Sequence, residues 1–175
     1  MSDVYFYKYL VNHQVFFRSK YTYALVNIKP LVPGHVLVVP LRTSILRFAD
    51  LSVEESQDYM STLQLIHKFI IHLYNADSLN IAIQDGPESG QSIPHLHTHL
   101  IPRYKTDGFG DGIYEKLDRL DLNNTLIDFF ERQQSYQKTG GFQPVPDEGR
   151  SPRSDEVLSN EAIWLKDELE KYMNQ

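Results

Sequence analysis

Histidine occupies every second position in one short segment of the chain, as His95, His97 and His99. Side chains alternate between the two faces of a β-strand, so this spacing places the three imidazoles on one face. A buried neutral imidazole needs both a hydrogen-bond donor and an acceptor, which makes a row of three costly to satisfy by accident. We therefore predict that residues 95–101 form a strand, closed by Pro102, with a functional site on its histidine face.

A metal ion is the first ligand that such a row suggests. A His-x-His pair can converge on one zinc ion, but positions i and i+4 lie about 13 Å apart along a strand, against a zinc–nitrogen distance of about 2.1 Å. All three histidines therefore cannot bind one ion. One pair with a third ligand remains open, and because the chain has no cysteine, that ligand would be His35 or a carboxylate such as Asp85.

Phosphate chemistry is the second possibility. Imidazoles about 7 Å apart match a chain of successive phosphates better than they match one ion. One histidine can attack phosphorus while its neighbours donate hydrogen bonds to the non-bridging oxygens. The preceding segment fits this role, since Gly90 permits close backbone approach and Gln84, Gln91 and Ser92 offer donors. It lacks the Gly-x4-Gly-Lys-Ser/Thr pattern of a Walker A loop.

Charge is unevenly distributed along the 175 residues. Residues 1–104 hold eight basic and eight acidic residues and all seven histidines, whereas residues 105–175 hold nine basic and fifteen acidic residues and thus the whole net charge of −6. This acidic balance argues against a nucleic-acid partner. No apolar run is long enough to span a membrane, and the first thirty residues lack the basic and apolar pattern expected of a signal peptide. We expect a cytoplasmic protein, whose small mass also permits entry into the nucleus or mitochondria.

The hydrophobic pattern predicts an α+β fold, with a mainly antiparallel sheet of about five strands, one long helix and an additional C-terminal helix. Ser52 and Glu55 form a capping box before apolar residues at steps of three and four, which predicts a helix over 52–74. The apolar residues Ile163, Leu165, Leu169 and Tyr172 predict the C-terminal helix. The predicted strands are 5–10, 15–17, 22–28, 35–39, 79–84 and 95–101. The predicted units are a catalytic domain over 1–120, a helical extension over 121–138, a disordered linker over 139–156 and a helix over 157–175.

Several motifs together resemble one family. His-Leu-His-Thr-His-Leu-Ile at 95–101 resembles the His-φ-His-φ-His-φ-φ signature of the histidine triad (HIT) superfamily, in which φ is apolar, with Thr98 as the one departure. Tyr-Ala-Leu-Val-Asn at 23–27, Lys-Pro-x-Val-Pro-Gly-His-Val-Leu-Val at 29–38 and Gln-Asp-Gly-Pro-Glu-x-Gly-Gln-Ser at 84–92 resemble its Fhit branch of diadenosine polyphosphate hydrolases. The Trp-Pro-Pro-Gly element of the Hint-type branch is absent from the sequence after the triad.

The resemblance implies an activity. Such an enzyme would cleave diadenosine triphosphate (Ap3A), and also the tetraphosphate (Ap4A), asymmetrically to AMP plus ADP or ATP. It would act through a nucleotidyl-histidine intermediate, with Mg²⁺ or Mn²⁺ bound to the substrate phosphates. The resemblance also implies a HIT-like fold and a homodimer whose sheets join. Its partners would be diadenosine polyphosphates and AMP, with no nucleic acid and no membrane.

The resemblance also assigns roles to individual residues. His97 would be the nucleophile, His95 and His35 would orient and polarise the site, and His99 would bind the α-phosphate. Asn27 would bind a ribose. The remaining substrate contacts would be Leu25 and Leu37 beside the adenine, Gln84 near the bridging oxygen, Gly90, Gln91, Ser92 and Ile93 along the polyphosphate, Lys8 at the N-terminal strand, and Tyr114 from a mobile loop.

Other interpretations stay open at this point. A nucleotide-binding signalling module with very slow turnover would use the same residues as the hydrolase. A zinc-dependent hydrolase built on one His-x-His pair is a third hypothesis. Leu25 and Leu37 would be core residues in any sheet, and His13, His67 and His72 are expected to be structural.

Overall fold

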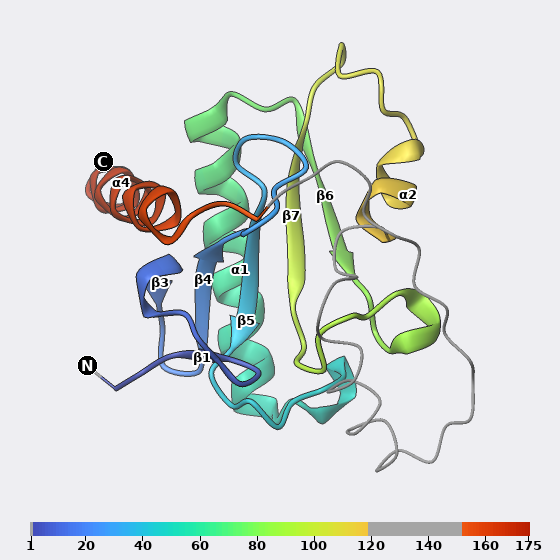
Figure 1. Cartoon of the computed structure of the whole chain (residues 1–175). Coiled ribbons are helices and arrows are strands. Elements are labelled where there is room, and N and C mark those ends of the chain that lie inside the picture. Colours follow the sequence, from blue (N-terminus) through green and yellow to red (C-terminus); the bar gives the residue numbers. More distant parts are fainter. Residues whose placement is uncertain (1, 119–151) are drawn as a thin grey trace.

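The computed structural model describes residues 2–118 and 152–175. A five-stranded antiparallel sheet of order β3-β4-β5-β7-β6 forms its centre, and β1 and β2 form a separate hairpin (Figure 1). Within the described ranges, no helix is long and apolar enough to cross a membrane. The elements are β1 (Tyr5–Phe6), β2 (Tyr9–Leu10), η1 (Asn12–Gln14), β3 (Val15–Arg18), β4 (Thr22–Val26), β5 (Val36–Pro40), η2 (Phe48–Asp50), α1 (Val53–Tyr74), β6 (Ser78–Ile83), η3 (Pro87–Ser89), β7 (Thr98–Arg103), α2 (Gly112–Asp118) and α4 (Asp155–Met173).

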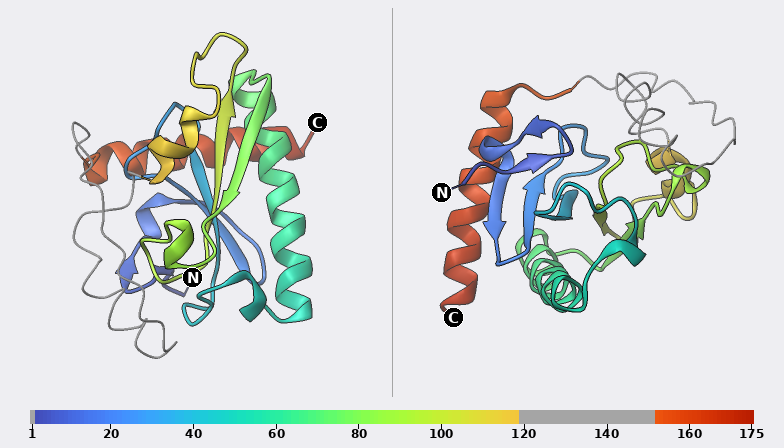
Figure 2. Two further views of the ribbon diagram at one scale, coloured as in Figure 1. Left: turned by 90° about the vertical axis from the view of Figure 1, so that its right-hand side faces the viewer. Right: turned by 90° about the horizontal axis from the view of Figure 1, so that it is seen from below.

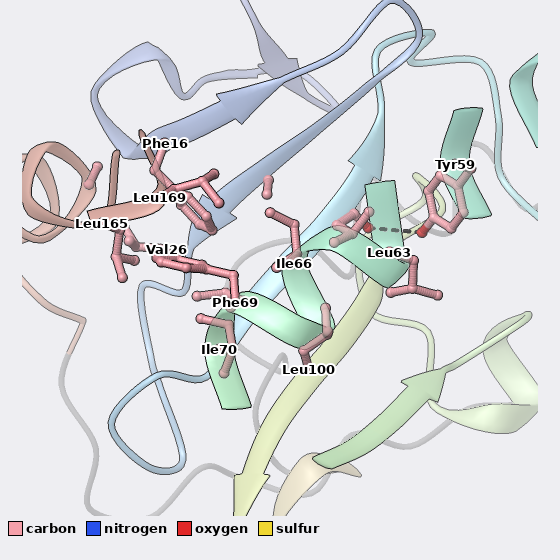
Figure 3. Close-up of a cluster of buried hydrophobic side chains, with 14 of the residues drawn as sticks. Phe16, Val26, Tyr59, Leu63, Ile66, Phe69, Ile70, Leu100, Leu165 and Leu169 are labelled. Carbon is pink, nitrogen blue, oxygen red and sulfur yellow. Dashed lines mark hydrogen bonds between the residues drawn. The ribbon is translucent and has the colours of Figure 1, made fainter. Parts of the chain in front are cut away.

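The long helix α1 covers one face of the sheet, and α4 lies beside the β3 edge (Figure 2). Ser52 caps α1 as predicted: its hydroxyl accepts a hydrogen bond from the amide of Glu55, whose carboxylate accepts one from the Ser52 amide. Arg42 binds the same carboxylate and lowers the pKa of Glu55 to about 2. The apolar stripe of α1 packs into the main core, as Figure 3 shows for Tyr59, Leu63, Ile66, Phe69 and Ile70.

The C-terminal helix exists as predicted, but its boundaries and apolar face differ. It begins at Asp155, with Ser154 as the N-cap, so the last two residues of the predicted linker are helical. Its buried stripe follows the spacing of a helix through Leu158, Ala162, Leu165 and Leu169. Ile163, one of the apolar residues that predicted this helix, is 58% exposed because it lies off that stripe. The helical extension over 121–138 and linker residues 139–151 lie outside the described residues.

The histidine strand begins later and ends later than predicted. β7 runs from Thr98 to Arg103, so His95 and His97 precede it and Pro102 lies within it. The pairing of β7 with β5 ends at Leu100, and beyond that point β6 is the one paired neighbour. A proline is tolerated where one side of a strand needs no donor. The predicted alternation nevertheless holds, since Leu96 and Leu100 are buried in the core with α1.

The first predicted strand is instead the β1–β2 hairpin. Tyr7 and Lys8 form its turn, and Tyr7 has a left-handed backbone conformation with φ 58°. The aromatic composition of residues 5–10 favoured a continuous strand, and no glycine signalled the turn.

Thr98, which departs from the triad signature, has a partner on α1. The Tyr59 hydroxyl donates to the Val38 carbonyl at 2.8 Å and lies 2.7 Å from the Thr98 hydroxyl. Since the single proton of Tyr59 is used on the carbonyl, Thr98 donates to Tyr59. The polar residue in the signature therefore connects β7 to α1.

We expect Tyr59→Phe to lower the free energy of unfolding by about 1–3 kcal/mol, because it leaves the buried Thr98 hydroxyl without its acceptor and Val38 without its donor. Thr98→Val should cost less, because it removes one polar group together with its bond. In the double variant, the loss should not exceed that of Tyr59→Phe alone. Urea unfolding measures all three, and a larger loss for Thr98→Val than for Tyr59→Phe would contradict the assigned hydrogen-bond direction.

Candidate active site

Four histidines gather on the face of the sheet opposite α1. His99 lies in β7, His35 immediately precedes β5, and His95 and His97 lie in the segment that enters β7. The antiparallel register pairs Leu37 of β5 with His99, which brings the two strands' histidines together. All four rings are buried, with residue exposures of 0–2%. Their hydrogen bonds therefore decide their protonation and tautomers.

A chain of hydrogen bonds connects the loop after β4 to His99. The Leu31 amide donates to Nδ1 of His35 at 3.0 Å, so this nitrogen has a lone pair and the proton is on Nε2. Nε2 of His35 lies 3.0 Å from Nδ1 of His99. His35 therefore donates to His99, and the proton of His99 is on its Nε2. The backbone of the loop thus makes Nε2 of His99 a donor.

His97 has the opposite tautomer. Its Nδ1 lies 2.8 Å from the carbonyl oxygen of His95, and a carbonyl can only accept. Nδ1 therefore holds the proton, which leaves a lone pair on Nε2, as a nucleophile requires. The Phe6 ring packs edge-on against His97 with centroids 5.3 Å apart, and the His99 ring lies at 5.0 Å.

His95 is oriented by the N-terminal hairpin. The Tyr7 amide donates to Nδ1 of His95 at 3.0 Å, which leaves the proton on Nε2. Nε2 is therefore a hydrogen-bond donor in His95 and in His99, whereas Nε2 of His97 has a lone pair. This order suits in-line attack on a group whose oxygens need hydrogen bonds.

Asn27 lies at the end of β4, beside the histidine chain. Its Oδ1 accepts from the Lys29 amide at 2.9 Å, and its Nδ2 lies 3.2 Å from Nε2 of His35. In the tautomer described above, Nε2 of His35 is a donor, and the Nδ2 group of Asn27 can only donate. The two groups are therefore in contact without a hydrogen bond between them. Asn27 is 5% exposed and therefore fixed at the edge of the site.

The loop before the triad supplies several of the predicted contacts. Gly90 has φ 87°, a conformation that favours glycine, and it ends η3. Gln91 is buried and donates from Nε2 to the Leu46 carbonyl at 2.8 Å. The Ser92 hydroxyl is buried and has no hydrogen-bond partner among the described residues. Gln84 follows β6 and is 6% exposed.

Leu25 and Leu37 are paired across β4 and β5 on the histidine face of the sheet. Both belong to a second buried cluster, against which Ile93 packs. Their contact with an adenine stays a prediction, because the same burial is what a core requires. Phe6 belongs to this cluster too and joins it to the histidine row.

Two predicted residues lie farther out. Lys8 is exposed in the hairpin turn, with its Nζ 5.9 Å and 5.7 Å from the ring centroids of Tyr7 and Tyr9. Tyr114 lies in α2, is 48% exposed, and its hydroxyl accepts from Asn80 of β6 at 2.8 Å. Both residues are exposed, whereas the four histidines of the site are buried.

The described residues do not place the ligands that a zinc-dependent hydrolase would need. Within residues 2–118 and 152–175, no group of three histidine, aspartate or glutamate side chains is placed to hold a metal ion. Asp85, one of the suggested ligands, accepts a hydrogen bond from the Phe48 amide at 2.8 Å. His13, His67 and His72 lie on η1 and α1, away from the site, as expected.

Sequence reasoning missed the groups that set the tautomers. The amides of Leu31 and Tyr7 and the carbonyl of His95 are main-chain atoms, which leave no signature in the sequence. Phe6 was recognised only as a strand residue. Its apolar side chain gave no signal that it packs on two histidines.

The arrangement matches a known family. The HIT domain family model matches residues 10–106, more than half of the chain. The chain belongs to the HIT family. The match covers β3–β7 and all four histidines of the site, and leaves α4 outside it. The expected HIT-like α+β fold is thereby confirmed.

Individual members of the HIT family resemble the chain closely. A bis(5'-adenosyl)-triphosphatase of Saccharomyces cerevisiae is 64% identical over 140 residues, which are 80% of this chain and 68% of the relative. An asymmetrical bis(5'-nucleosyl)-tetraphosphatase of Schizosaccharomyces pombe is 39% identical over 170 residues, covering 94% and 93%. The crystal structure of Plasmodium falciparum diadenosine triphosphate hydrolase with cyclomarin A has a TM-score of 0.69 at 27% identity, covering 98% of this chain and 86% of that one.

The tautomers of this HIT site can be observed directly. We expect side-chain ¹⁵N NMR spectra to show His97 in the Nδ1–H form and His35, His95 and His99 in the Nε2–H form, because of the fixed donors and acceptors described above. Single histidine-to-glutamine variants assign the signals, and the three histidines outside the site serve as references. A protonated Nε2 on His97 would contradict the assignment of this ring as the nucleophile.

Proposed function

We propose that the chain is a dinucleoside polyphosphate hydrolase that cleaves Ap3A, and also Ap4A, asymmetrically with His97 as the nucleophile. The observation that carries this proposal is the contact of His97 Nδ1 with the His95 carbonyl, which leaves the lone pair of His97 on Nε2, while the contacts of its neighbours make Nε2 of His95 and of His99 donors. The names of the two fungal relatives support the substrate class. The products are AMP and ADP from the triphosphate, or AMP and ATP from the tetraphosphate.

In the first step, Nε2 of His97 attacks the α-phosphorus in line. The P–N bond forms as the bond from phosphorus to the bridging oxygen breaks, and the nucleotide leaves with the electron pair. Nε2–H of His95 and of His99 donate to the non-bridging oxygens, whose charge must be stabilised in the transition state. The carbonyl of His95 accepts from Nδ1–H and so stabilises the positive charge that the ring gains.

In the second step, water attacks phosphorus and the P–N bond breaks, which releases AMP and restores neutral His97. The terminal phosphate of the leaving nucleotide has a second pKa of about 6, so this group is stable as an anion at neutral pH. It requires charge neutralisation more than a proton. Gln84 near the bridging oxygen and the Ser92 hydroxyl supply hydrogen bonds for this purpose.

A divalent cation completes the charge balance. The site is built from imidazoles, amides and a hydroxyl, and the described residues around it do not form a carboxylate cluster. Mg²⁺ or Mn²⁺ would therefore be held by the substrate's own phosphates and would enter with them. When bound, it neutralises phosphate charge as a Lewis acid.

The rest of the substrate follows the strands that hold the histidines. Asn27 binds the ribose of the transferred nucleotide, and its adenine lies against Leu25 and Leu37, which belong to one apolar cluster. The loop of Gly90, Gln91, Ser92 and Ile93 contacts the polyphosphate. Lys8 and Tyr114, both exposed, contact the part of the substrate that extends out of the site.

We also propose that the functional unit is a homodimer in which the sheets of two copies join. β6 is an edge strand of six residues with β7 as its one neighbour, and Ile81 on it is 49% exposed. Such an edge can pair with an identical strand. Sedimentation equilibrium should therefore give twice the chain mass, and a monomer at enzyme-assay concentrations would contradict the proposal.

Chromatography of the products tests the hydrolase directly. With Ap3A and Mg²⁺ we expect equal amounts of AMP and ADP, and a kcat/KM for His97→Ala reduced roughly 10⁴-fold, because the nucleophile is lost. His67→Ala on α1 is the matched control and should keep full activity.

The same assay separates the remaining alternative. Tight nucleotide binding with no products from the wild-type protein would favour the slow signalling module. Rapid quench at alkaline pH, at which the acid-labile P–N bond survives, should trap a nucleotide on His97 during turnover. A complete absence of this adduct would contradict the covalent step while leaving hydrolysis itself intact.

A further inference from the structure

The C-terminal segment contacts the active site at the end of β4. Arg153 donates from its guanidinium to the Asn27 carbonyl at 2.5 Å, and its amide donates to the Ile28 carbonyl at 3.1 Å. The same guanidinium forms an ion pair with Glu161 of α4, with Nη1 and Oε2 2.5 Å apart. Arg153 thus joins α4 to the residue proposed to bind the ribose.

Residues 27–35 follow β4, and their far end is also supported by α4, through Tyr74 of α1. Gly34, one residue before His35, has φ 82° and lies under the Tyr74 ring, where a Cβ would come within 2.8 Å of ring carbons. The Trp164 ring of α4 packs edge-on against Tyr74, with centroids 6.1 Å apart. Burial, and then the charge of Glu161, raise the pKa of Tyr74, so it stays a neutral packing group.

The segment between these two supports contains the start of the histidine chain. Residues 27–35 include the Leu31 amide, which fixes the tautomer of His35, and His35 donates to His99. Movement of this segment would displace the Asn27 side chain and the Leu31 amide together. α4 itself is docked independently through its apolar stripe in the main core.

We propose that Arg153, paired with Glu161, is a positioning residue that holds residues 27–35 in their binding conformation. The expected effect on nucleotide affinity rests on the proposed function. It gives α4, which lies outside the HIT domain match, a role in nucleotide binding. Arg153 and Glu161 are 23% and 19% exposed, so water and salt screen their ion pair less than they screen a fully exposed pair. Arg153 acts through Asn27, so its loss should weaken ground-state and transition-state binding alike.

The test compares Arg153→Met with Lys171→Met in the full chain. Lys171 forms an exposed ion pair with Glu168 on α4. Lys171→Met therefore removes one positive charge from the same part of the chain but leaves the Arg153 contacts in place, and it serves as the matched control. For Arg153→Met we expect AMP to bind about tenfold more weakly and KM for Ap3A to rise by a similar factor, with kcat within about twofold. Lys171→Met should match the wild type, and Arg153→Lys should recover part of the affinity.

Two further measurements separate a positioning role from a merely structural one. Melting temperatures report loss of stability, and a fall in melting temperature with unchanged AMP affinity and KM would overturn the proposal. Amide hydrogen exchange over residues 27–35 needs no ligand, so it tests the contact even if the chain proves not to be a hydrolase. Faster exchange there in Arg153→Met than in Lys171→Met supports the proposal, and equal exchange in both overturns it.

Discussion

The site depends on the antiparallel pairing of β5 with β7. This pairing sets Leu37 opposite His99 and Val36 opposite Leu100, so one face packs on α1 while the other presents imidazoles. A slip of one residue in the register of β7 would turn its histidine toward the apolar core and a leucine toward the site. Burial of Leu96 and Leu100 in the core therefore stabilises the arrangement on which the chemistry depends.

The proton positions come from three separate parts of the chain. The loop after β4 provides an amide for His35, the N-terminal hairpin provides one for His95, and the triad segment provides a carbonyl for His97. Each contact satisfies a ring nitrogen that would otherwise be costly to bury. The same hydrogen bonds that stabilise the fold therefore give His97 the tautomer that the proposed nucleophile requires.

Much of the architecture could be predicted from local patterns. The capping box of Ser52 and the helical spacing after it defined α1 correctly, and alternation assigned the two faces around the triad. The errors have physical causes. Pro102 is tolerated in β7 because pairing with β5 has ended, and Ile163 is exposed because the docking face of α4 is set by what it packs against. Neither cause is visible in a window of neighbouring residues.

The sequence by itself determined which residues could share the histidine face, because the side-chain alternation of an extended chain needs no knowledge of the rest of the fold. Only the tertiary structure decided which nitrogen of each ring holds the proton. For His95 that choice depends on a main-chain group distant in sequence, the Tyr7 amide, 88 residues away. Arg153 likewise reaches Asn27 across 126 residues. Hydrogen bonding is short-ranged in space, so only the folded chain can establish these contacts.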